Sequence, residues 1–313
     1  MVLEEQTLHY FLKAFSLLFI ILLYFFYFLF FREITLKNEV FNITKNQNYL
    51  NVVDDNINDN FVNIIIYKSF LNLFKSKLHY GKFKLSENRN FKSLIETITK
   101  PSNVLEKIII IEGSSIISLN LKLKKMFDKY QTLEYNQLIA DTYYFNNGLS
   151  FQKFKEQLHI HKKKIEKKYN KSPLSKKFTF DEILVIGSLL EKEGLDYNDK
   201  KNIYSVIVNR LKKNMKLQID ATVIYALTEG NYNLNRKLTY NDLKIKHNFN
   251  TYFIYGLPPM PISYVGSKTI ELILENYKTN YLFYFFNTLK GKHIYSTNYI
   301  NHLKKLNEYR SKK

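Results

Sequence analysis

The sequence predicts an α+β protein: an N-terminal transmembrane helix, a small α/β module, and a mainly helical domain with a small β-hairpin. Three observations lead to this prediction. Residues 10–31 form an apolar run long enough to cross a bilayer as a helix. Up to about residue 114, short apolar strands alternate with helix-forming segments. Beyond residue 179, a helix that is apolar on every side precedes amphipathic ones.

The bulk composition fits a folded protein and excludes some functions. The 313 residues allow about two domains, at ~150 residues each. Hydrophobic residues make up 45% of the chain, and there is no cysteine, which excludes disulfides and thiolate metal sites. The net charge of +19 comes mostly from lysine, with only five arginines. Phosphate recognition tends to use arginine and no nucleic-acid motif is present, so no nucleic-acid partner is expected.

The apolar run is predicted to be an uncleaved anchor preceded by a short tail, residues 1–9. Lys13 is the only charge within residues 10–31. A signal peptide is the competing interpretation, but it should have a shorter apolar region followed by a pair of small residues. Here Phe31 and Arg32 follow, with no small pair. Basic residues lie on both sides of the run, so the positive-inside rule does not decide its orientation.

Three regions are expected after the anchor. Residues 38–114 are the α/β module, with strands at 62–67, 107–111 and after 78, and helices at 70–78 and 91–98. Residues 115–178 are a helical connector that ends in a lysine-rich linker. Residues 179–313 are the second domain, with helices from about 180 and 198, a hairpin at 281–287 and 293–296, and a final helix. Thr179 and Glu182 have the spacing of a capping box at the start of the first helix.

Glu191 stands out because it is a carboxylate on the predicted all-apolar helix. Helical spacing places it on one face with the small residues Gly187 and Ser188. Its place in the last turn and its apolar surroundings both disfavour a charge, which suits a general acid. The structural alternative is that Glu191 pairs with Lys192 or with a lysine distant in sequence. Glu193 is expected to face solvent.

Polar residues gather at turns downstream and are candidates to bind a ligand. Asp220 is also a natural N-cap for a helix beginning near Thr222, and Ser267 for a later helix. No metal is expected. The candidates are Gln218, Asp220, Thr222, Asn250, Tyr252 and His293.

Four motifs, in order, resemble those of the endolytic murein transglycosylase (MltG or YceG-like) family. The first is Ser188-Leu189-Leu190-Glu191-Lys192-Glu193; the second is Asn209-Arg210-Leu211 with residues 215–225; the third is Asn250-Thr251-Tyr252 with residues 256–262; the fourth is residues 293–298 with His302. Weaker matches are residues 78–85, Glu112-Gly113 and residues 141–143. Among the departures, Gly187 replaces a usual alanine and Met260 a usual glycine.

The resemblance implies a LysM-like module in the front half and a lysozyme-like catalytic domain at residues 179–313. It implies Glu191 as the catalytic acid, the six polar candidates as substrate-binding residues, and no cofactor. The expected location is the inner membrane, with the N-terminus in the cytoplasm and the body in the periplasm. The expected partners are peptidoglycan strands and cell-wall synthases.

The implied activity is cleavage of the MurNAc-β-1,4-GlcNAc bond within glycan strands to give 1,6-anhydro-MurNAc ends, terminating nascent strands. One carboxyl group suffices when the sugar's own C6 hydroxyl is the nucleophile. Two alternatives remain open from the sequence. One is a non-catalytic, membrane-anchored peptidoglycan-binding scaffold, and the other is a cytosolic lyase of small metabolites, against which the anchor argues.

Overall fold

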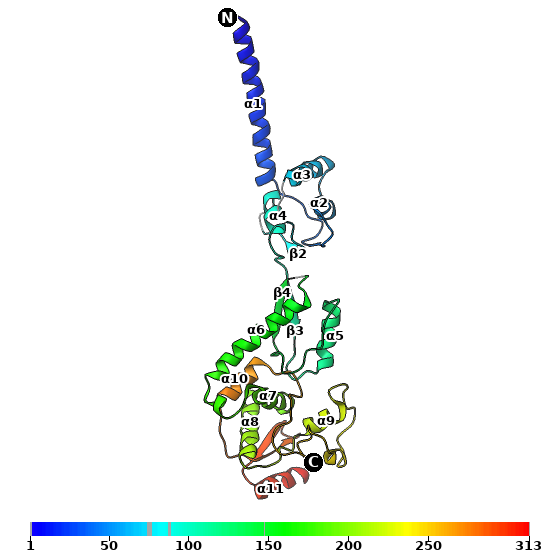
Figure 1. The fold of residues 1–313 in the computed structure, drawn as a ribbon, viewed down its shortest axis with the longest axis vertical. Helices are drawn as coiled ribbons and strands as arrows, with labels where there is room; N and C mark the ends of the chain where they lie inside the picture. The colour runs from blue at the N-terminus through cyan, green and yellow to red at the C-terminus, as the bar shows by residue number, and fades with distance from the viewer. Residues whose placement is uncertain (1, 74–76, 87–88, 147, 313) are drawn as a thin grey trace. The chain divides into compact units, whose positions relative to one another are not determined.

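The computed structural model describes residues 2–73, 77–86, 89–146 and 148–312, which form a mixture of helices and small sheets (Figure 1). The chain divides into two compact units: Met1–Lys107 with Tyr144–Leu149, and Ile108–Tyr143 with Ser150–Lys313. Two of the three boundaries fall within strands, β3 (Leu105–Ile109) and β4 (Thr142–Asn146), and the third follows Leu149. The predicted α+β class is therefore confirmed, while the LysM-like and lysozyme-like assignments and the finer domain limits stay predictions.

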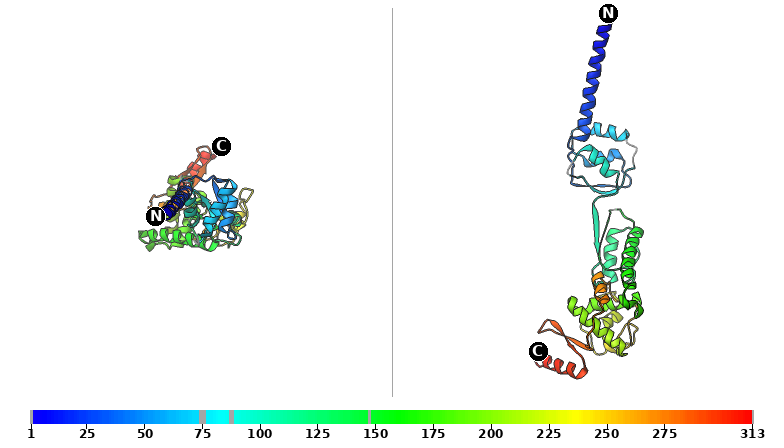
Figure 2. Two further views of the ribbon diagram at one scale, coloured as in Figure 1. Left: turned by 90° about the horizontal axis from the view of Figure 1, so that it is seen from above. Right: turned by 90° about the vertical axis from the view of Figure 1, so that its left-hand side faces the viewer.

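The N-terminal helix α1 (Val2–Phe30) contains the apolar run expected from the sequence. Its 22-residue segment His9–Phe30 is long and apolar enough to cross a membrane, by length and composition. Most of α1 stands clear of the rest of its unit in Figure 1 and in the right-hand view of Figure 2. Phe28 is the exception, because it is 1% exposed and packs into the core of the first unit.

The rest of the first unit surrounds a small antiparallel pair of strands, β1 (Val40–Ile43) and β2 (Gly81–Lys84). Its helices are α2 (Tyr49–Asn56), α3 (Phe61–Leu73) and α4 (Phe91–Ile98). The strand expected after residue 78 and the helix expected at 91–98 are confirmed as β2 and α4. Asn90 and Ser93 form a capping box that fixes the start of α4.

The strand predicted at residues 62–67 is wrong, because this segment belongs to helix α3. A short continuous apolar run has no period that distinguishes a buried strand from a helix. The side chain of Asn60 accepts a hydrogen bond from the backbone amide of Asn63 at 2.9 Å, as a helix-capping residue does. The helix predicted at 70–78 is present only as the end of α3, and residues 74–76 lie outside the described residues.

The second unit begins with two helices, α5 (Ile116–Met126) and α6 (Phe151–Asn170). The lysine-rich segment is mostly helical, since α6 continues to Asn170 before the short 3-10 helix η1 (Pro173–Lys176). The strand β3 confirms most of the one predicted at 107–111.

Three helices form the centre of the second unit: α7 (Phe180–Glu193), α8 (Tyr197–Lys212) and α10 (Ser267–Leu274), each in contact with the other two. Helix α9 (Asp220–Thr228) packs against α7, and the 3-10 helix η2 (Asp242–Lys244) packs against α9. Ser267 does not cap α10, whose N-cap is Gly266. This helical centre carries the residues singled out from the sequence.

The chain ends in the expected hairpin and helix. Strands β5 (Phe283–Asn287) and β6 (Lys292–Ser296) pair antiparallel, with Tyr284 opposite Tyr295 and Phe286 opposite His293. Helix α11 (Tyr299–Arg310) packs beside both strands (Figures 1 and 2). The hairpin brings Tyr284 and His293 to the end of α7.

Candidate active site

The last turn of α7 presents two carboxylates to different surroundings. The helix starts at the capping box predicted from the sequence, in which Thr179 and Glu182 exchange hydrogen bonds. It ends at Gly194, where a Cβ atom would lie only 2.2 Å from Cγ of Lys200, so glycine is required by close packing. Two residues apart on this turn, Glu191 and Glu193 point to different sides of the helix.

Glu191 is held by groups of the chain itself. Its side chain is 3% exposed, and Oε2 lies 2.5 Å from Nζ of Lys200 on α8. The backbone amide of Gly266 donates to Oε1 at 3.1 Å. The sequence left open that Glu191 pairs with a lysine distant along the chain, and Lys200 is that lysine. Both carboxylate oxygens already accept hydrogen bonds, so Glu191 links α7, α8 and the segment before α10.

The face beside Glu191 is filled rather than open. A Cβ atom on Gly187 would lie 2.5 Å from Cγ1 of Val265. The hydroxyl of Ser188 accepts a hydrogen bond from the backbone amide of Ile262 at 3.1 Å. Both small residues are buried. The space that they leave receives residues 262–266 of the same chain.

A second carboxylate, Glu112, lies near Glu191. A Cβ atom on Gly266 would lie 2.1 Å from Oε1 of Glu112, and one on Gly113 would lie 3.5 Å from Cβ of Glu191. Partial desolvation and then the charge of Glu191 raise the pKa of Glu112. Gly113 also donates from its backbone to the carbonyl of Tyr264 at 2.8 Å. The Glu112-Gly113 motif thus packs against the end of α7.

Glu193 is partly buried, so the expectation that it faces solvent is wrong. Burial, followed by the negative charge of Asp220, raises the pKa of its carboxyl group. The hydroxyl of Tyr284 donates to Oε2 of Glu193 at 3.2 Å. The backbone amide of Ala221, in the first turn of α9, also donates to this carboxylate. Glu193 therefore lies among α9, β5 and the end of α7.

Two of the predicted binding residues, Asp220 and Tyr252, belong to this second cluster. The hydroxyl of Tyr252 donates to Oδ1 of Asp220 at 2.6 Å. Asp220 is the first residue of α9 and makes no capping hydrogen bond, so its assignment as an N-cap is wrong. Gln218 is exposed beside it, with a left-handed φ of 51°. A non-glycine residue in that region is uncommon and is characteristic of constrained loops.

Two other predicted binding residues, Thr222 and Asn250, are fully buried at 0% exposure. The hydroxyl of Thr222 donates to the carbonyl of Ile219 at 2.6 Å and pairs with the hydroxyl of Thr251. The amide of Asn250 donates to the carbonyls of Leu243 and Ile245 at 3.0 and 2.8 Å. These contacts fix the loop that carries Tyr252 and leave both side chains without access to a ligand.

His293 is also enclosed, and its neighbours explain why. Its Nδ1 lies 2.8 Å from Oδ2 of Asp199, and its side chain is 7% exposed. The hydroxyl of Tyr295 donates to the other oxygen of Asp199 at 2.6 Å. Although burial opposes the charge, hydrogen bonds from His293 and Tyr295 hold the pKa of Asp199 below its usual value. The ring of His293 meets Tyr284 edge-on, 5.3 Å between centroids.

Arg210 and Tyr284 belong to this site but were not among the predicted binding residues, although Arg210 lies in the second motif. Arg210 donates to the backbone carbonyls of Leu217 and Leu282, both at 2.7 Å. Burial lowers its pKa, and it lies within electrostatic range of the Tyr252 and Tyr284 hydroxyls. The sequence offered a signal for Glu193 itself, since its helical neighbours Ile186, Leu189 and Leu190 are all apolar; each is 0% exposed.

The chemistry available to this cluster is proton transfer. It holds an acid of raised pKa, a neighbouring carboxylate, two tyrosine hydroxyls and a buried arginine. Within the described part of the chain, no group of three His, Cys, Asp or Glu side chains is arranged to hold a metal ion. A partly buried acid among hydrogen-bonding side chains is an arrangement used for general acid–base catalysis.

Comparison with known proteins agrees with the motifs. The model of the YceG-like family matches residues 41–308. An endolytic murein transglycosylase of Bacillus subtilis (strain 168) is 37% identical over 144 residues, which are 46% of this chain and 39% of that protein. One of Streptococcus pneumoniae serotype 2 (strain D39 / NCTC 7466) is 33% identical over 138 residues, 43% of this chain and 25% of that protein. The matches thus span well under half of these relatives.

A crystal structure of a yceG-like protein has a similar fold. A yceG-like protein from Listeria monocytogenes superposes with a TM-score of 0.52 at 24% identity, covering 85% of this chain and 98% of that one. Since the family model matches most of the sequence, this chain belongs to the YceG-like family.

Proposed function

We propose that this protein is a membrane-anchored lytic transglycosylase that cuts peptidoglycan within its glycan strands. Family membership and the relatives named endolytic murein transglycosylase support this proposal. The supporting observation within the site is the raised pKa of a partly buried carboxyl group, Glu193, beside Tyr284 and Asp220. A raised pKa favours the protonated form of the carboxyl group, which is the form that a general acid needs.

The geometry favours Glu193 over Glu191 as the acid. Each carboxylate accepts one backbone amide, of Gly266 for Glu191 and of Ala221 for Glu193. Glu191 also forms an ion pair with Lys200 at 2.5 Å, whereas the side-chain donor to Glu193 is the neutral hydroxyl of Tyr284 at 3.2 Å. Four of the six predicted binding residues also have contacts in or next to the Glu193 cluster: Gln218, Asp220, Tyr252 and His293. Glu191, the catalytic residue expected from the sequence, remains the alternative that the experiment below tests.

In the proposed reaction, Glu193 transfers its proton to the bridging oxygen of the MurNAc-β-1,4-GlcNAc bond. The bond between that oxygen and C1 of MurNAc breaks, and GlcNAc leaves with a free hydroxyl. The C6 hydroxyl of the same MurNAc then attacks C1, and the Glu193 carboxylate accepts its proton. Water is not consumed, and the new end is 1,6-anhydro-MurNAc. A well-oriented intramolecular nucleophile has an advantage of roughly 7–11 kcal/mol over one from solution.

The neighbours of Glu193 have supporting roles in this proposal. After burial, the negative charge of Asp220 further raises the pKa of Glu193, and the hydroxyl of Tyr284 donates to the carboxylate once the proton has left. Exposed Gln218 and the pair Asp220–Tyr252 are placed to bind sugar hydroxyl or N-acetyl groups. Asp220 is not needed as a nucleophile, because the C6 hydroxyl takes that role.

The deciding experiment compares Glu193→Gln with Glu191→Gln in the full-length protein acting on purified glycan strands. Glutamine keeps the size of the side chain and removes the transferable proton. General acid catalysis contributes about 10²–10⁴-fold, so Glu193→Gln should lose cleavage while remaining folded. Loss of cleavage only in a folded Glu191→Gln variant would return the role to Glu191. No cleavage by the unaltered protein would favour the non-catalytic scaffold.

The proposed location is the inner membrane, with α1 as a single-pass anchor, the N-terminus in the cytoplasm and the body in the periplasm. The apolar segment His9–Phe30 supports the anchor, and the relatives named murein transglycosylases support a body on the cell-wall side. We further propose that cutting terminates nascent strands beside cell-wall synthases. Because the chain has no cysteine, a single cysteine on either side of α1 tests this orientation with a membrane-impermeant thiol reagent.

A further inference from the structure

Helix α3 exposes large apolar side chains at its N-terminal end. Phe61 is 78% exposed, Val62 64% and Ile65 46%, although the same helix buries Tyr67 and Leu71 completely or nearly so. Val62 and Ile65 are three residues apart and share one face of the helix. An exposed cluster of large apolar side chains on a folded unit indicates a surface that another apolar partner covers.

The partner is indicated by the contacts of α3 with the apolar end of α1. The rings of Phe70 and Phe25 lie 5.3 Å apart, and those of Tyr67 and Phe28 lie 5.0 Å apart. Between the two helices is a groove of about 280 Å³, lined by Phe25, Ile65, Ile66, Ser69 and Phe70. The exposed face of α3 is therefore continuous with the side of α1.

The position of these contacts along α1 sets the depth of α3. The segment His9–Phe30 has 22 residues, or about 33 Å of helix at 1.5 Å per residue. The hydrocarbon core of a bilayer is about 30 Å thick. Phe25 lies five residues before the end of the segment, which is about 7.5 Å along the axis. The side chains of α3 next to Phe25 then lie at the level of the outer acyl chains and headgroups.

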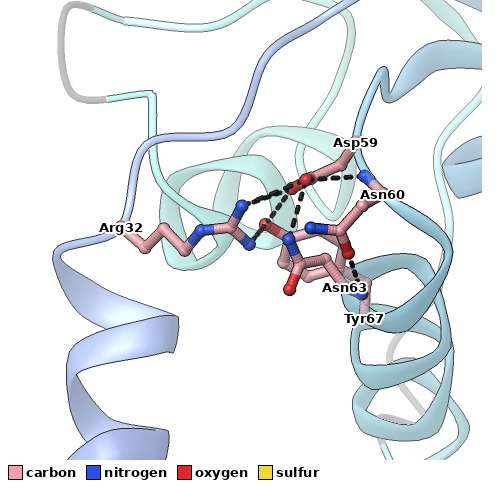
Figure 3. A network of polar contacts seen from close by, with 5 residues as sticks. All are labelled: Arg32, Asp59, Asn60, Asn63 and Tyr67. Atoms are coloured by element: carbon pink, nitrogen blue, oxygen red, sulfur yellow. Dashed lines mark hydrogen bonds and ion pairs between the residues drawn. The ribbon is translucent and has the colours of Figure 1, made fainter.

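A polar network fixes the angle between the two helices (Figure 3). Arg32, just after α1, forms an ion pair with Asp59 at 3.0 Å and donates to the hydroxyl of Tyr67 at 3.2 Å. The amide of Asn63 on α3 donates to Asp59 at 2.7 Å. Although burial opposes its charge, hydrogen bonds from Asn63 and Arg32 hold the pKa of Asp59 below its ordinary value. The network keeps α3 beside α1.

We propose that α3 is an interfacial membrane helix, whose Phe61, Val62 and Ile65 insert among the lipids of the leaflet where α1 leaves the bilayer. At 13 residues, α3 is too short to cross the membrane, so its exposed apolar side chains can enter only one leaflet. The first unit would then have a fixed tilt at the membrane surface. This proposal rests on the proposed anchoring by α1.

The absence of cysteine allows a direct depth measurement on the full chain. Four single-cysteine variants carry the same environment-sensitive fluorophore: Val62→Cys and Ile65→Cys on α3, Leu18→Cys on α1, and Val40→Cys as the matched control. Val40 is 41% exposed, on strand β1 of the same unit, opposite Lys84. The proteins are reconstituted in phosphatidylethanolamine–phosphatidylglycerol vesicles, with quenchers placed either on the acyl chains or in the aqueous phase.

We expect acyl-chain quenchers to quench the labels at Val62 and Ile65 several-fold more than the label at Val40, with iodide giving the reverse order. If Leu18 is quenched by lipid while Val62 and Ile65 behave like Val40, the α3 proposal fails and the anchor stands. If Leu18 itself escapes the lipid quencher, the anchor fails and the α3 proposal with it. Protection from both quenchers, with disulfide-linked dimers on oxidation of the same cysteine variants before labelling, would mean that a second copy covers α3.

Discussion

The hydroxyl of Tyr284, on strand β5, donates to Oε2 of Glu193, in the last turn of α7, at 3.2 Å. This contact joins the C-terminal hairpin to the helix that carries both candidate acids. It stabilises the charged form of Glu193, while burial and the charge of Asp220 stabilise the neutral form. The two side chains therefore have opposite effects on one carboxyl group, and the effects can be measured separately.

The pH dependence of cleavage should follow Glu193. A general acid works while protonated, so activity is present below its pKa and is lost as pH rises through it. Asp220→Asn removes the charge that raises this pKa, and the alkaline limb of kcat/KM should move to lower pH. Tyr284→Phe removes a donor to the carboxylate and should move the limb to higher pH. We expect shifts of roughly 0.5–1 pH unit, since one unit corresponds to about 1.4 kcal/mol.

An unchanged limb in both variants would show that Glu193 does not supply the proton. Shifts of the same sign would show that the substitutions act through the fold.

Glu191 should contribute mainly to stability. Glu191→Gln leaves Lys200 without its carboxylate in a setting where the lysine side chain is 16% exposed. Breaking a largely buried pair typically costs about 3 kcal/mol or more, and thermal unfolding should show a loss of this order. Replacing both partners, as Glu191→Gln with Lys200→Met, should recover part of the loss. Wild-type stability together with abolished cleavage in Glu191→Gln would contradict this assignment.

The contact between Gly187 and Val265 gives a packing test. A Cβ atom on Gly187 would lie 2.5 Å from Cγ1 of Val265, so Gly187→Ala should destabilise the second unit by about 1–3 kcal/mol. Val265→Ala removes the obstructing methyl groups, and the double variant should lose less than the sum of the single ones. Strict additivity in urea unfolding would show that the two sites are independent. The usual alanine of the family would thus be tolerated only with a smaller residue at 265.

Local signals were sufficient to predict several elements and insufficient for the contacts between them. The start of α7 followed from Thr179 and Glu182, because a capping box involves only residues three apart. The run at 62–67 was assigned to a strand because a short apolar segment has no decisive period. Helix α3 there is stabilised by packing of Tyr67 against Phe28 and Phe91, which are distant in sequence.

The candidate site, too, could be predicted only in part from the sequence. The sequence identified Asp220, Tyr252 and His293 as binding candidates without placing them in space, and the structure brings them around Glu193. Thr222 and Asn250 were chosen for their polarity, but their hydrogen bonds go to Ile219, Thr251 and the 243–245 backbone. The partner of Glu191, Lys200, comes from α8, and nothing in the sequence distinguished it from the other lysines.

The central claim is that this site cuts glycan strands without using water as the nucleophile. Digestion of purified strands by the full-length protein in heavy-oxygen water, followed by mass spectrometry of the products, tests it most directly. We expect 1,6-anhydro-MurNAc ends that contain no heavy oxygen, and no such products from the Glu193→Gln variant. Incorporation of the label at new MurNAc ends would mean hydrolysis and would contradict the account, with Asp220 then required as a second catalytic group.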